Sequence, residues 1–113
     1  MRRNRLAIAE AWRAEGDVAR AMALLEPEMA LLDAPNAVSV PACVLEEHMN
    51  AWRVLKAAAD SRAARQLELA HDRLQRLVAR IRDPLVRERM LTFSPLHREA
   101  AAAWAAHQQQ RAN

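Results

Sequence analysis

The side chains best suited to chemistry are four histidines, one cysteine and a few serines, and their spacing assembles no catalytic or metal site. Two histidines four residues apart place both rings on one face of a helix, as in the H-E-x-x-H zinc motif. None of His48, His71, His97 and His107 lies four residues from another. No serine lies in the glycine-flanked turn that exposes a hydrolase nucleophile. We therefore expect no catalysis, no metal and no cofactor, and keep a small all-helical enzyme only as a third hypothesis.

The single cysteine, Cys43, excludes an intramolecular disulfide and a cysteine-ligated metal cluster. Its position just after Pro41, where a helix is expected to start, can lower a thiol pKa. The flanking valines favour a packing role instead. One cysteine without a partner is typical of the cytoplasm, which we predict as the compartment. The apolar run at 6–9 ends at Glu10, too soon for a signal peptide, and no stretch is apolar enough to span a membrane.

The elements that must position any site are helices. The 113 residues include 26 alanines and 16 arginines, but only one glycine, one lysine and no tyrosine. Alanine, leucine, arginine and glutamate favour helices, whereas the β-branched and aromatic residues typical of strands are scarce. One glycine also excludes a glycine-rich phosphate loop and a dinucleotide fingerprint. The composition predicts a single all-α domain.

Turn and capping residues divide the chain into six segments. Gly16 and Asp17 follow the first helical run, a proline-containing loop covers 33–41, and Asp60 and Ser61 interrupt a later run. Asp83-Pro84 and Ser94-Pro95 each place a good N-cap residue before a proline. The expected helices cover 3–15, 18–32, 41–59, 61–82, 84–92 and 95–110, with a kink or a break at Pro27.

Charge is distributed unevenly along this chain. Residues 1–50 carry 5 basic and 8 acidic groups, whereas residues 51–113 carry 12 basic and 6 acidic groups, so the halves have net charges of −3 and +6. At 100° per residue, one edge of the helix at 61–82 collects five arginines, namely Arg62, Arg65, Arg73, Arg76 and Arg80. Such a basic stripe is either a solvated surface or a binding face for an acidic partner or nucleic acid.

A repeat with a separation of 43 residues runs through the first four helices. Trp12, Gly16, Asp17, Ala21 and Leu25 recur at the same offsets as Leu55, Ala59, Asp60, Ala64 and Glu68. In each unit a large residue of the first helix packs inward, a small residue allows the turn, and an aspartate can cap the second helix. The units are expected at 3–32 and 41–82, followed by a C-terminal cap at 83–110.

This pattern resembles the tetratricopeptide repeat, in which helix pairs stack into a right-handed solenoid. The segment Ile81-x-Asp83-Pro84-x-x-Arg87-x-x-Met90-Leu91-x-x-Ser94-Pro95, together with 52–71, is similar to the tail of large bacterial regulators. In those proteins a cyclase, signalling-ATPase or DNA-binding activator domain precedes a tetratricopeptide array. None of those domains fits into 113 residues, so the resemblance implies only the helical module. It also implies that the segment at 83–110 closes the apolar end of the stack, with Trp104 as its anchor.

The resemblance also predicts a binding surface, because the first helix of each tetratricopeptide pair lines a concave groove. The groove-facing candidates are Arg3, Leu6, Glu10, Arg13, Glu46, Met49, Arg53 and Lys56. Their basic end suits a peptide that carries carboxylates. The main hypothesis is therefore a non-enzymatic module that holds a protein partner, an acidic peptide or a second copy of itself. The alternative is a small nucleic-acid-binding regulator that uses the basic stripe, which the acidic residues among the arginines disfavour.

Overall fold

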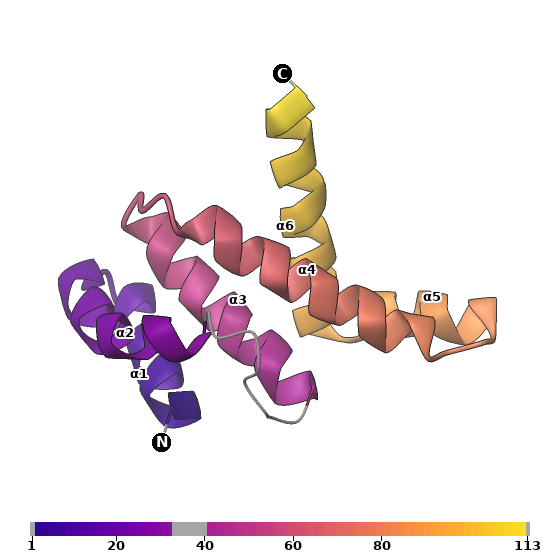
Figure 1. Ribbon diagram of the computed structural model, residues 1–113, viewed down its shortest axis with the longest axis horizontal. Coiled ribbons are helices and arrows are strands. Elements are labelled where there is room, and N and C mark those ends of the chain that lie inside the picture. The colour runs from indigo at the N-terminus through magenta and orange to yellow at the C-terminus, as the bar shows by residue number, and fades with distance from the viewer. Residues whose placement is uncertain (1, 33–40, 113) are drawn as a thin grey trace.

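The computed structural model describes residues 2–32 and 41–112, in which every regular element is a helix (Figure 1). The all-α prediction is confirmed. The helices are α1 (Arg2–Ala14), α2 (Val18–Leu32), α3 (Pro41–Ala57), α4 (Ala63–Ala79), α5 (Pro84–Phe93) and α6 (Pro95–Ala112). None of the described helices is long and apolar enough to cross a membrane.

The predicted proline-containing caps explain where α5 and α6 begin. The Asp83 carboxylate accepts a 2.9 Å hydrogen bond from the backbone N–H of Leu85, with Pro84 as the first helical residue. Ser94 Oγ accepts a 3.4 Å bond from the backbone N–H of His97. Pro27 does not divide α2, which continues from Val18 to Leu32, so the helix is not broken there.

The turns after α1 and α3 have the same geometry. Gly16 has φ +91° and Ala59 has φ +54°, so both adopt the left-handed conformation that ends many helices. The N–H of Asp17 donates to the carbonyl of Trp12, and the N–H of Asp60 donates to the carbonyl of Leu55, each at 2.9 Å. With the bonds from Gly16 to Arg13 and from Ala59 to Lys56, both turns are Schellman motifs.

Two apolar cores meet at α3, the central helix of Figure 1. The first core joins α1, α2 and α3, and its buried members are Leu6, Ala9, Ala21, Leu25, Met29, Ala51, Val54 and Leu55. The second core joins α3, α4 and α6, and its buried members are Leu45, Met49, Leu67, Ala70, Leu74 and Ala100. Because α3 supplies residues to both cores, it holds the two halves of the chain together.

The seam between α3 and α4 also contains a buried polar pair that apolar periodicity does not predict. His48 Nδ1 lies 2.8 Å from Gln66 Oε1, and both residues are buried. A buried polar group is costly unless it has a partner, so this pair fixes one alignment of α3 against α4. The apolar stripe predicted for α4 faces the same way, since Leu67, Ala70 and Leu74 are buried.

The last two helices differ in how they pack. Helix α6 packs on α4, and the Trp104 ring stacks on His71 with centroids 4.0 Å apart. Helix α5 packs mainly on α6 and has no buried residue. The segment expected to form the cap packs on the second core mainly through α6, with Ala100 and Trp104, while α5 contributes the half-buried Leu91.

Candidate functional site

An open hollow of about 460 Å³ lies where α1, α3 and α6 come together. Its lining residues are Arg13, Trp52, Arg53, Lys56, Ala57 and Glu99. Three of the predicted groove residues, Arg13, Arg53 and Lys56, are thus in one place. The hollow is the strongest candidate site among the described residues, because cationic groups and an aromatic face converge on a concave surface.

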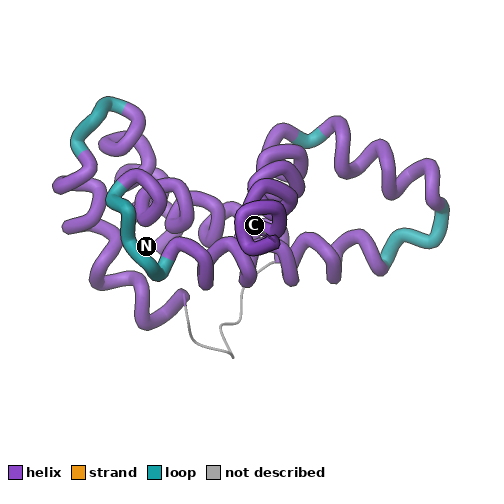
Figure 2. The backbone as a smooth tube through the Cα atoms, turned by 90° about the horizontal axis from the view of Figure 1, so that it is seen from above, coloured by secondary structure: helices purple, strands orange, loops and turns teal. Residues whose placement is uncertain are grey.

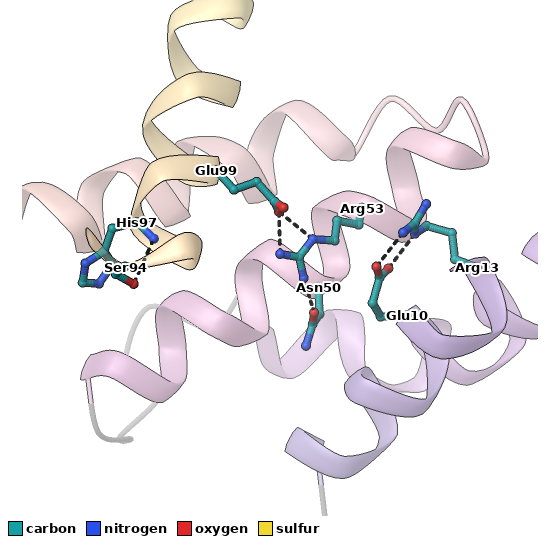
Figure 3. Close-up of polar contacts among 7 residues, drawn as sticks. All are labelled: Glu10, Arg13, Asn50, Arg53, Ser94, His97 and Glu99. Atoms are coloured by element: carbon teal, nitrogen blue, oxygen red, sulfur yellow. Dashed lines mark hydrogen bonds and ion pairs between the residues drawn. The ribbon is translucent and has the colours of Figure 1, made fainter. Parts of the chain in front are cut away.

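Arg53 is positioned by groups on two helices (Figure 3). Its Nε donates to Glu99 Oε1 of α6 at 2.6 Å, and its Nη1 donates to Asn50 Oδ1 of α3 at 2.7 Å. The Arg53 side chain is only 22% exposed. This arginine therefore joins α3 to α6, and its charge is largely balanced by Glu99.

Arg13 is balanced in the same way by a residue of its own helix. Its Nε and Nη2 donate to the two carboxylate oxygens of Glu10, each at 2.6 Å, which is the paired geometry typical of arginine and carboxylate. The hydrogen bonds to Glu10, with smaller contributions from the charges of Glu10 and Glu99, raise the pKa of Arg13. Glu10 thus lies beside the hollow as the counter-ion of Arg13.

Lys56 is the cation of the hollow that keeps an available charge. Its Nζ lies 4.9 Å from the centre of the Trp52 ring, and its side chain is exposed. No ion pair within the described parts of the chain involves Lys56. Lys56 thus places its ammonium over the half-buried Trp52 ring, and both side chains line the hollow.

Two groove predictions are wrong because the residues belong to the cores. Met49 is 0% exposed in the second core, and Leu6 is 1% exposed in the first. In each case the helix turns this side chain toward a neighbouring helix, not toward the hollow. Glu46 is half-buried and does not line the hollow. The side chain of Arg3 lies outside the described residues.

The predicted basic stripe is largely engaged within the chain. Arg65 lies 3.9 Å from Glu68, and Arg76 lies 3.1 Å from Asp72. Arg62, just before α4, pairs with Asp60 and with Glu26 of α2. Arg73 is half-buried and Arg80 is exposed at the end of α4. The arginines on this edge therefore include three that are paired with acids of the same chain.

Arg62 makes the densest of these networks and carries a testable pH dependence. Hydrogen bonds from the Arg62 side chain and backbone lower the pKa of Asp60 from 3.8 to about 2. The stabilisation that this shift represents is complete above pH 3.8 and is lost as the pH falls through 2. The free-energy difference between the wild type and Arg62→Ala, measured by chemical unfolding, should narrow from pH 6 to pH 2.

The control for this experiment is Arg65→Ala, whose 3.9 Å pair with Glu68 is more exposed. It should change stability little at either pH, since exposed pairs contribute little. If the difference in unfolding free energy between the wild type and Arg62→Ala stayed constant from pH 6 to pH 2, the pairing of Arg62 with Asp60 would be contradicted.

The histidines do not form a site in the structure. In the described part of the chain, no three histidine, cysteine, aspartate or glutamate residues are grouped so that they could hold a metal ion. His71 packs against Trp104, and the ring of His97 lies 3.2 Å from the Met90 carbonyl oxygen. Desolvation lowers the pKa of His71, although Asp72 opposes the effect. Cys43, which the sequence placed at a helix start, has a side chain outside the described residues.

Sequence reasoning missed half of the hollow. Trp52 and Glu99 line it, and Asn50 orients Arg53 beside it. The sequence did carry a signal for Trp52, because a tryptophan stands there whereas the corresponding residue of the first unit, Ala9, is small. Glu99 had none, since its place depends on how α6 packs.

The chain matches no protein-family model, no curated protein and no solved structure. Any function must therefore rest on its own residues and their geometry.

Proposed function

We propose that this chain is a non-enzymatic protein-interaction module, built as a short tetratricopeptide-like stack, that binds an acidic peptide segment in the hollow between α1, α3 and α6. The observation that carries the proposal is the pairing of an available cation, Lys56, with the face of Trp52 on a concave surface. Arg13 and Arg53 have counter-ions in Glu10 and Glu99, so they shape the wall and leave recognition of an extra carboxylate to Lys56.

Two features of the fold support the tetratricopeptide-like part of the proposal. The main helix contacts follow the order expected for stacked pairs, in which α1 meets α2 and α3, α2 meets α3, and α3 meets α4. The turns inside the two pairs close with the same hydrogen bonds. We extend the proposal to a relative of the C-terminal array of a cytoplasmic bacterial regulator, as the segment from Ile81 to Pro95 suggests.

The nucleic-acid alternative has weaker support. Phosphate binding needs available cations, and Arg62, Arg65 and Arg76 are each paired with an acidic side chain.

A random 12-residue peptide library displayed on phage and selected on the purified chain tests the proposal. Selected peptides should be enriched in aspartate and glutamate next to an apolar residue. Lys56→Glu should weaken the binding of a selected peptide at least tenfold, because it replaces the available cation by a like charge. Fluorescence anisotropy of the labelled peptide measures the change.

The matched control is Arg111→Glu, which makes the same charge reversal at an exposed position in the last turn of α6. It should leave the dissociation constant within about twofold, after allowance for long-range charge, which salt screens. A selection without acidic enrichment, or equal binding by the two variants, would overturn the assignment of the hollow.

A further inference from the structure

Helix α5 has an apolar face that no described part of the chain covers. Leu85, Val86 and Phe93 are 55%, 47% and 75% exposed. At 100° per residue, these three positions fall within one arc of about 100°, with Arg89 inside it. Arg89 is exposed and takes part in no ion pair within the described residues. Exposed apolar residues grouped in this way mark an interaction surface.

A second apolar surface lies on α1, where the half-buried Trp12 packs against the first core. Ile8 is 50% exposed there, and an apolar hollow of about 260 Å³ is lined by Ile8, Ala11, Trp12 and Glu15. Glu15 is exposed and, like Arg89, has no ion-pair partner among the described residues. This hollow thus combines an apolar floor with one available negative charge.

The two surfaces lie at opposite ends of the molecule. Figures 1 and 2 both show α1 and α2 at one end of the longest axis, which measures 43 Å, and α5 at the other. The surfaces therefore cannot meet within one copy. They are complementary in charge, Arg89 against Glu15, and so are the halves that carry them, with net charges of −3 for residues 1–50 and +6 for residues 51–113.

We propose that the chain associates head to tail, with the apolar face of α5 of one copy docked on the α1 hollow of the next. Phe93 enters the hollow beside Ile8 and Trp12, and Arg89 pairs with Glu15 at its edge. An interface between two different surfaces leaves one of each unused in a pair, so it continues into a ring or an open chain of copies. The proposal is independent of the peptide hollow, whose residues lie on α1, α3 and α6.

The test uses two variants that each disable one surface. Phe93→Asp blocks the α5 face, and Ile8→Asp blocks the α1 hollow, while each leaves the other surface intact. Both residues are exposed, so the folded helices should persist, as circular dichroism can verify. Sedimentation velocity of the wild type should show association that grows with concentration and weakens with salt. Each variant alone should be monomeric, and an equimolar mixture of the two should form a one-to-one dimer.

Other partners give other outcomes, and each would overturn the proposal. If α5 faces paired with each other, Ile8→Asp would still self-associate and the mixture would gain nothing. If α1 hollows paired, Phe93→Asp would still self-associate. If the wild type stayed monomeric at millimolar concentration, the apolar face of α5 would have to bind a different protein. Ala105→Asp, at an exposed position of α6, is the control and should associate like the wild type.

A charge exchange provides a second check on the same interface. Arg89→Glu and Glu15→Arg should each weaken self-association at least tenfold, and combining both changes in one chain should restore it. Failure of the combined variant to recover would contradict the pairing of these two residues.

Discussion

Replacing Met49 with alanine should lower the free energy of unfolding by about 2–5 kcal/mol, the usual cost of truncating a fully buried methionine or leucine. Met49 is 0% exposed and packs in the second core with Leu45, Leu67 and Leu74. A domain of this size has a total stability of only about 5–15 kcal/mol, so the variant loses a large part of it. Chemical denaturation followed by circular dichroism measures the loss.

The comparison variant is Lys56→Ala, on the same helix but exposed. Its unfolding free energy should stay within about 0.5 kcal/mol of the wild type, as is usual for surface positions. Peptide binding should respond in the opposite order: Lys56→Ala should weaken it, whereas Met49→Ala should retain it under conditions where the variant is folded. If Met49→Ala kept the unfolding free energy of the wild type but lost peptide binding, Met49 would have to be assigned to the groove and not to the core.

The error over Met49 shows how far periodicity could define the site. The alignment of the two repeat units at Gly16 and Ala59 predicts that Met49 and Arg53 both face the groove. These residues are four positions apart and therefore lie on one face of α3. That face is the right one for Arg53 and Lys56, which line the hollow. Toward the start of α3, the same face is covered by α4 and α6, so Met49 is buried with Leu45. A helix pattern alone does not tell which turns of a face a later helix will cover.

The local signals in the sequence were more reliable than the long-range ones. The N-termini of α5 and α6 were predictable from the sequence. An aspartate or serine followed by proline favours the start of a helix, because the side chain can accept a hydrogen bond from a backbone N–H two or three residues later. The ion pair of Arg53 with Glu99 and the exposure of Phe93 depend on how α6 crosses α4 and α3. Those arrangements depend on the packing of the whole core, and the sequence near Arg53, Glu99 and Phe93 contains no pattern that predicts them.

Substitutions at the two turn residues should change stability in opposite directions. Gly16 has φ +91°, and a Cβ added there meets no atom within 4 Å, so Gly16→Ala changes only the backbone preference. A left-handed conformation costs a non-glycine residue about 1–2 kcal/mol, while restricting the unfolded chain returns about 0.4–1 kcal/mol. Gly16→Ala should therefore lower the free energy of unfolding by about 1 kcal/mol.

Ala59 has φ +54° and already bears the left-handed cost, so the reverse substitution should relieve it. Ala59→Gly is expected to raise the free energy of unfolding by up to about 1 kcal/mol, despite the greater freedom that glycine gives the unfolded chain. Ala58→Gly, one residue earlier, provides the control and should destabilise, because glycine gains nothing where φ is negative. Denaturant titration of the three variants under one set of conditions measures these changes. If Gly16→Ala and Ala59→Gly shifted stability in the same direction, the two turns would differ in energy despite their shared hydrogen bonds, and their equivalence in the 43-residue repeat would fail.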